Sequence, residues 1–91
     1  MRHKRIPDSG SVPEYAALGR AVRELRVVRA LSQEELAYRS YMHRNYLGAI
    51  ERGRVNPTFD VILRLLYGLN TTIDMLVEAY NRHVKAIASA N

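Results

Sequence analysis

The sequence of 91 residues contains no cysteine and no tryptophan, and it has a single phenylalanine. Without cysteine the chain can form neither disulfides nor thiolate metal sites, so its stability must come from the packing of side chains. One small domain of this length buries only somewhat more than half of its unfolded surface. A second protomer would therefore add useful buried surface.

Long apolar runs are also missing. No stretch approaches the roughly 20 apolar residues that a membrane-spanning helix needs. The N-terminus, Met1 to Pro7, lacks the apolar segment of a signal peptide. We therefore expect a cytoplasmic protein with no membrane partner.

Groups that support catalysis or metal binding are scarce. His3, His43 and His83 lie far apart and have no carboxylate at a metal-binding or proton-relay spacing. Glu34 and Glu35 are adjacent, so on a helix their side chains point about 100° apart and cannot face each other. No glycine-rich phosphate loop is present. We expect no enzyme activity, no metal, no cofactor and no small-molecule ligand.

Acidic residues are outnumbered, since 14 Lys and Arg face 9 Asp and Glu, which gives a net charge of +5. All the basic residues except Lys4 and Lys85 are arginines. The planar guanidinium presents paired donors that suit phosphates and base edges. Acidic partners are favoured, although charge alone does not single out nucleic acid.

Residues 1–13 predict a flexible arm, because basic residues are followed there by proline, glycine and serine. Arg2, Lys4 and Arg5 could lie along a phosphate backbone or enter a minor groove. The alternative is a solvated tail.

Residues 32–52 predict two short helices joined by a tight turn. Ser32 and Glu35 form a capping box that starts the first helix. Leu47 and Ile50 repeat at helical spacing in the second helix, which we expect to run from about residue 44 to 52, and Gly53 ends it.

Three further helices surround this pair. A first helix is expected over residues 14–29, where Leu18, Val22 and Leu25 share a face. Thr58 caps a fourth helix and Thr72 a fifth. The apolar residues that we expect the fourth helix to contribute to the core are Phe59, Ile62, Leu63, Leu66 and Tyr67.

The fifth helix carries apolar residues at alternating steps of four and three, namely Ile73, Val77, Tyr80, Val84 and Ile87. Its last part continues past the compact domain, which we place at residues 14–78, into an extension at 79–91. We expect Tyr80, Val84 and Ile87 to form part of a homodimer interface. The alternative is a monomer in which this stripe folds back over Val27 and Val28.

The order and spacing of these elements resemble the helix-turn-helix of Cro/repressor-type (XRE family) DNA-binding regulators. The resemblance covers roughly residues 18–77. It is carried by Leu18, Val22, Leu25-Arg26, Leu31-Ser32-Gln33-Glu34-Glu35-Leu36-Ala37, Tyr46-Leu47, Ile50-Glu51-Arg52-Gly53, Asn56-Pro57-Thr58 and the run from Leu69 to Leu76.

The resemblance implies an all-α, compact five-helix lambda-repressor-like domain with an extended C-terminal helix. It also implies an ion pair between Arg26 and Glu51. The family usually has glycine where this chain has Ala30 and Tyr41, and a left-handed residue other than glycine costs about 1–2 kcal/mol.

Under this resemblance, the start of the second helix of the motif reads bases in a major groove. The residues expected to contact bases are Arg44, Asn45, Tyr46 and Ala49, while Gly48 leaves space for close approach. The residues expected to contact phosphates are Gln33, His43, Arg52, Arg54 and Asn56. Tyr38 and Tyr41 are available to the backbone on weaker grounds.

The expected function is sequence-specific binding of double-stranded DNA by a homodimeric transcriptional regulator at a partly palindromic operator. The motif is similar to the controller proteins of restriction-modification systems and to single-domain repressors. The alternative is a protein-interaction module, such as an antitoxin subunit, in which DNA binding is secondary.

Overall fold

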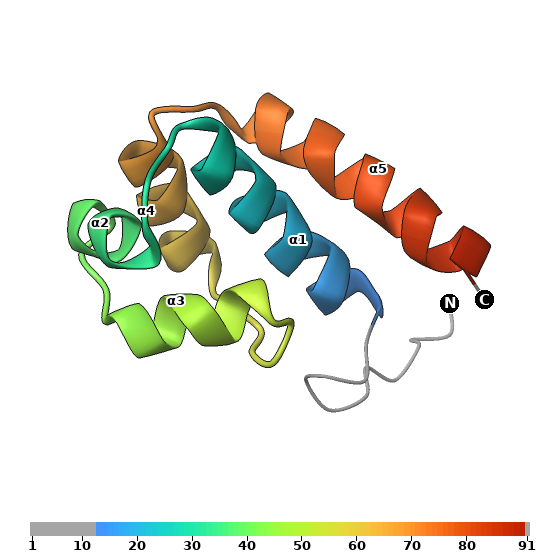
Figure 1. Ribbon diagram of the computed structural model, residues 1–91, viewed down its shortest axis with the longest axis horizontal. Coiled ribbons are helices and arrows are strands. Elements are labelled where there is room, and N and C mark those ends of the chain that lie inside the picture. The colour runs from blue at the N-terminus through green and yellow to red at the C-terminus, as the bar shows by residue number, and fades with distance from the viewer. Residues whose placement is uncertain (1–12, 91) are drawn as a thin grey trace.

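The computed structural model describes residues 13–90, which fold entirely into helices and their connections. This confirms the predicted all-α, five-helix architecture with a long last helix (Figure 1). Within the described residues, no helix is both long and apolar enough to cross a membrane. Of the arm expected at 1–13, all but Pro13 lies outside the described part. The helices are α1 (Pro13–Val28), α2 (Gln33–Arg39), α3 (Arg44–Glu51), α4 (Phe59–Leu69) and α5 (Ile73–Ala90).

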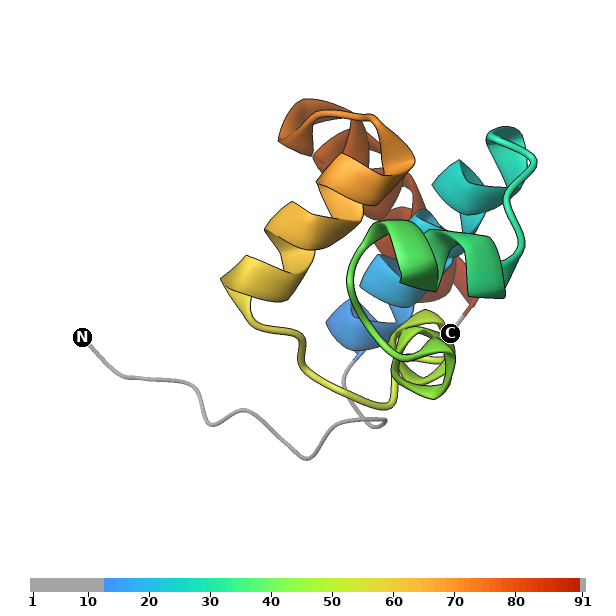
Figure 2. The same cartoon turned by 90° about the vertical axis from the view of Figure 1, so that its left-hand side faces the viewer.

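Helix α1 lies at the centre of the fold. Helix α5 runs alongside it in the opposite direction, and α3 lies on its other side (Figure 1). Helix α2 packs on α3 and α4, and Figure 2 shows it crossing above α3, which is seen nearly end-on. Burial of each large apolar side chain contributes about 1.5–3 kcal/mol. The largest side chains in the common core are Val22, Leu25, Leu31, Leu36, Leu47, Ile50, Val61, Leu65, Leu66, Leu69 and Leu76.

The predicted capping box starts α2. The Ser32 hydroxyl accepts a hydrogen bond from the Glu35 N–H at 3.0 Å, and the Glu35 carboxylate accepts one from the Ser32 N–H at 2.9 Å. The hydrogen bond from the Ser32 backbone lowers the pKa of Glu35. Ala30 and Tyr41 have φ angles of 56° and 57°, so both positions are left-handed although neither residue is glycine.

Two glycines allow the close approach of α1 to α3. A Cβ at Gly19 would overlap the Ile50 carbonyl oxygen. Gly53 ends α3 with φ of +72°, and a Cβ there would lie 2.8 Å from the Ala16 Cα. Both positions therefore require glycine, one for space and the other also for its backbone conformation.

The expected apolar stripe of α4 is wrong in part. Leu66 is buried and Ile62 packs against the core, but Phe59, Leu63 and Tyr67 are 63%, 47% and 73% exposed. The buried face of α4 also uses Val61, Leu65 and Leu69, which lie on the neighbouring side of the helix. Since α4 is apolar on more than one face, periodicity alone could not show which face packs.

The apolar stripe of α5 that we expect at a homodimer interface is packed partly within the chain. The helix is continuous from Ile73 to Ala90 and packs along α1, with Ala79 fully buried and Tyr80 against the core. Val84 and Ile87 are half-buried on the same helix. Val77, by contrast, is 46% exposed. The small side chain of Ala79 lets α1 approach, and Tyr80 packs against the core beside it.

Helix α5 does not cover Val27 and Val28, which remain 58% and 70% exposed. Polar contacts join α1 and α5 instead. The Glu24 carboxylate accepts two hydrogen bonds from Arg82, at 3.0 and 2.9 Å, and lies 2.8 Å from His83 Nε2. The hydrogen bond from Arg82 is the main reason that the pKa of Glu24 is lowered. This cluster fixes the position of α5 along α1.

Replacing Tyr41 by glycine should raise the free energy of unfolding by up to about 1 kcal/mol, because relief of left-handed strain exceeds the backbone entropy cost of glycine. The ring is 74% exposed, so its loss removes little packing. Denaturant titration measures the change, with Ala30→Gly expected to act likewise. Gly53→Ala should act in the opposite direction. A clear loss of stability in Tyr41→Gly would show that the ring contributes more than the strain costs.

Candidate nucleic-acid interface

A buried ion pair joins α1 to the end of α3, as the resemblance implies. Arg26 Nε lies 2.7 Å from Glu51 Oε2, and Arg26 Nη2 donates to Glu51 Oε1 at 3.0 Å. The side chains are only 13% and 3% exposed. Arg26 Nη1 also donates to the Leu31 carbonyl oxygen at 2.9 Å. One guanidinium thus links α1, α3 and the segment before α2.

The Gln33 side chain completes this junction. Its amide nitrogen donates to Glu51 Oε1 at 2.9 Å, so α2 is tied to the same carboxylate. The sequence assigned Gln33 only to phosphate binding and missed this bond. A polar residue at the start of a helix is expected to be exposed. No neighbouring residue in the sequence indicates that the Gln33 side chain turns toward Glu51.

His43 caps α3. Its Nδ1 accepts a hydrogen bond from the Asn45 backbone N–H at 3.0 Å, which requires an unprotonated Nδ1. The ring therefore replaces the usual serine or threonine cap. Its Nε2 takes no part in the cap and is left for an external acceptor.

The first residues of α3 present polar side chains to solvent. Arg44 and Asn45 are both exposed, whereas Tyr46 is half-buried and packs against the core. Ala49, one turn further along, is half-buried. The structure therefore brings Arg44, Asn45 and Ala49 to one helix, and gives Tyr46 a packing role in addition to any external contact.

We expected Gly48 to leave open space at the surface, but it does not. It is buried, and a Cβ there would lie 3.0 Å from Arg52 Nη1 and 3.8 Å from Gln33 Oε1. The Arg52 guanidinium thus folds back over Gly48, beside Gln33. The absent side chain accommodates neighbouring groups of this chain and not an approaching ligand.

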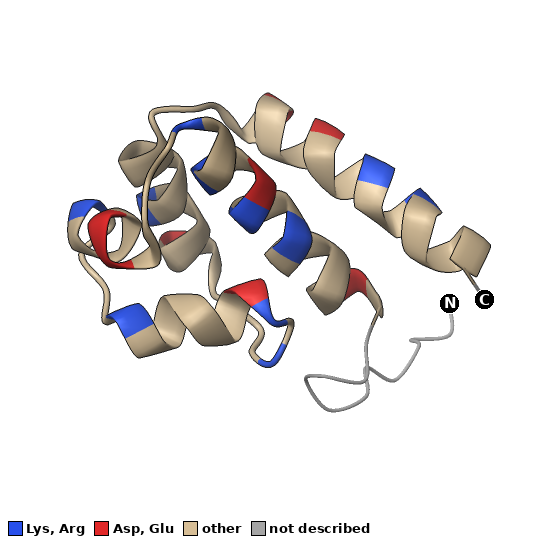
Figure 3. Ribbon diagram, viewed as in Figure 1, with Lys and Arg blue, Asp and Glu red and all other residues tan. Residues whose placement is uncertain are grey.

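Positive charge is placed at both ends of α3 and in the loop that follows it (Figure 3). Arg52 and Arg54 are exposed, as is Asn56, while Val55 between them packs against the core. The half-buried Val55 anchors the loop so that its polar neighbours face outward. The α3 helix and this loop, from Arg44 to Asn56, form the candidate interface.

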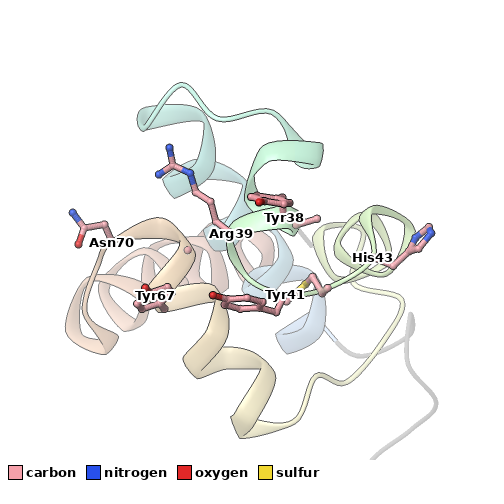
Figure 4. A pocket seen from close by; sticks show the side chains of 9 residues that line it. Tyr38, Arg39, Tyr41, His43, Tyr67 and Asn70 are labelled. Atoms are coloured by element: carbon pink, nitrogen blue, oxygen red, sulfur yellow. The ribbon is translucent and has the colours of Figure 1, made fainter.

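Three exposed tyrosines line a groove beside this interface (Figure 4). Tyr38 comes from α2, Tyr41 from the turn and Tyr67 from α4, and the rings of Tyr41 and Tyr67 lie next to each other. His43 lies at the opposite side, next to α3, and points away from the groove. Within residues 13–90, no three His, Asp or Glu side chains are placed to hold a metal ion.

Comparison with known proteins identifies the class. A helix-turn-helix domain model matches residues 17–79, and the chain belongs to this family. The helix-turn-helix is a DNA-binding motif whose second helix enters the major groove. Here that helix is α3, which is where the exposed Arg44 and Asn45 lie.

Individual relatives are controller proteins. Control protein C.SmaI of Serratia marcescens is 40% identical over 60 residues, which are 66% of this chain and 71% of that protein. The crystal structure of the restriction-modification controller protein C.AhdI from Aeromonas hydrophila is 37% identical with a TM-score of 0.70, over 71% of this chain and 98% of that one. The controller C.Esp1396I, solved bound to a 19 base pair DNA duplex, shares the fold at 24% identity and a TM-score of 0.73, over 78% of this chain and 95% of that one.

Replacing Glu51 by alanine should lower the free energy of unfolding by about 3 kcal/mol, because it leaves the buried Arg26 guanidinium without its carboxylate. Thermal or denaturant unfolding measures the loss. Glu34→Ala, which removes the same charge from an exposed position of α2, is the matched control and should change stability by less than about 0.5 kcal/mol. A loss below about 1 kcal/mol in Glu51→Ala would contradict the role of this pair.

Proposed function

We propose that the protein is a transcriptional regulator that binds a partly palindromic duplex as a homodimer. The observation that carries this proposal is the pair of exposed side chains, Arg44 and Asn45, at the start of a helix that the buried Arg26–Glu51 pair holds in place. The names of its relatives, control and controller proteins, support regulation of a restriction-modification system.

Base reading is assigned to the exposed start of α3. Arginine can donate two hydrogen bonds to O6 and N7 of guanine, and asparagine matches N6 and N7 of adenine. The methyl group of Ala49 can contact a thymine methyl group. Tyr46 is half-buried, so only part of its side chain is available to the DNA.

Phosphate binding is assigned to groups that flank α3. Arg52, Arg54 and Asn56 lie at its end and in the following loop, and His43 offers Nε2 at its start. Gln33 donates one amide hydrogen to Glu51 and has a second available, since a side-chain amide has two N–H donors. These contacts position the helix and carry no sequence information themselves.

We place the homodimer interface on apolar residues on the outside of α4 and α5, because Tyr80, Val84 and Ile87 are already half-buried within the chain. Phe59 and Leu63 on α4 are 63% and 47% exposed, and Ile73, Met75 and Val77 on α5 are 42%, 48% and 46% exposed. Association through these helices would remove the exposed apolar side chains from water. A two-fold dimer would place two α3 helices about 34 Å apart, so half-site centres should be about 10 base pairs apart.

Arg44→Ala should weaken binding to the preferred duplex by roughly 1–3 kcal/mol and relax the preference at one base position. Arg54→Ala should weaken binding to all sequences similarly and reduce the slope of the salt dependence by about one unit. Selection of duplexes from a random pool, followed by titration at several salt concentrations, separates the two effects.

Unchanged affinity and preference in a folded Arg44→Ala variant would refute the base-reading assignment. If the wild-type protein shows no salt-dependent affinity for any duplex, the interaction-module alternative replaces DNA binding.

Leu63→Asp should convert the dimer into a monomer, because it places a charge in the proposed interface. Sedimentation equilibrium at micromolar concentration measures the change. Val27→Asp is the matched control, since Val27 is also exposed but lies on α1, and this variant should remain dimeric. A monomeric wild type, or equal effects of the two variants, would contradict the interface.

A further inference from the structure

Arg64, on α4, makes a set of hydrogen bonds that the recognition motif itself does not contain. Its Nε and Nη2 atoms donate to Asp60 Oδ2 at 3.0 and 2.6 Å. Its Nη1 donates to the Tyr41 carbonyl oxygen at 3.0 Å, across 23 positions of the sequence. A single guanidinium thus connects α4 to the turn between α2 and α3.

This turn combines a strained backbone with a few backbone hydrogen bonds, one of them from the Met42 N–H to the Ala37 carbonyl oxygen at 3.0 Å. Tyr41 adopts a left-handed conformation with φ of 57° that costs a non-glycine residue about 1–2 kcal/mol. Its N–H bonds the Tyr38 carbonyl oxygen at the long distance of 3.3 Å. The peptide that carries the Tyr41 carbonyl leads within three residues to Arg44, so a change in its orientation is transmitted directly to the start of α3.

Asp60 orients the guanidinium before it reaches the turn. Asp60 and Arg64 are spaced by one helical turn, which allows such pairs to interact. The side chains of Arg64 and Asp60 are 42% and 68% exposed, and both belong to α4, a helix with four buried leucine or valine side chains. The turn is therefore held against a rigid helix.

We propose that Arg64 is a positioning residue for base reading: it fixes the Tyr41 carbonyl and thereby the direction in which Arg44 and Asn45 point. The inference rests on the proposed function, since it concerns how the same interface attains its specificity. Arg64 contacts no base and is not a phosphate ligand. Its effect on binding passes through the turn.

The first test compares Arg64→Ala with Lys85→Ala, which removes the same charge from α5, on the far side of α1 from α3 (Figure 1). Arg64→Ala should lower the affinity for the preferred duplex about fivefold, in line with a partly exposed charged contact, and should leave the salt slope unchanged. Lys85→Ala should leave affinity for the preferred duplex and base preference as in the wild type.

A double-mutant cycle supplies the decisive result. In a background that carries both Arg44→Ala and Asn45→Ala, Arg64→Ala should have no further effect, because both side chains that it positions have been removed. Additive losses, or a salt slope reduced by about one unit in Arg64→Ala, would show that Arg64 is itself a phosphate contact and would overturn the proposal.

Arg64→Lys provides a second variant in case Arg64→Ala does not fold. Lysine keeps the charge but lacks the planar fork needed to bond Asp60 and the Tyr41 carbonyl together. It should retain the salt slope and lose part of the base preference. Wild-type preference in Arg64→Lys would overturn the proposal. Duplex binding that depends on Arg44 but is the same in the Arg64 variants as in the wild type would refute this inference. It would leave the proposed function standing.

Discussion

The arrangement of the whole motif depends on one buried carboxylate. Glu51 lies at the end of α3 and receives hydrogen bonds from Arg26 of α1 and from Gln33 of α2. A carboxylate that is 3% exposed is tolerable only when it is paired and hydrogen-bonded. Three helices therefore keep one mutual orientation, and the opposite end of α3 projects Arg44 and Asn45 into solvent.

The remaining constraints act at the ends of the two motif helices. The Ser32–Glu35 capping box starts α2, His43 caps α3, and Gly53 ends α3 where a side chain would strike α1. Each is a local backbone requirement met by a particular residue type. Together with the ion pair they fix both ends of α3, so its exposed face is presented rigidly.

Local signals made most of the fold predictable from the sequence. The capping box and the Gly53 stop depend on neighbouring residues only, and the structure confirms them. The choice of packing face failed where a helix is apolar on several sides. In α4 the stripe with Phe59 and Leu63 is exposed, because burial is decided by which neighbouring helix is available.

Long-range contacts account for what the sequence did not show at the site. Gln33 turns toward Glu51 and Arg64 reaches Tyr41, and the two members of these pairs are 18 and 23 positions apart in the sequence. Similarly, Tyr80 packs against the core next to the fully buried Ala79. The spacing of the apolar residues in the sequence does not reveal this packing. The exposure of Arg44 and Asn45, in contrast, follows from their place at the start of a capped helix.

The most direct test of the account is the map of backbone amide NMR shifts when labelled protein is titrated with a duplex selected from a random pool. The account predicts that the largest changes fall on Arg44, Asn45, Ala49 and residues 52–56, while Val27, Val28 and the last two turns of α5 shift little. Changes concentrated on α5 or along the exposed valines of α1, with α3 unaffected, would contradict the claim that the buried junction exists to present α3 to DNA.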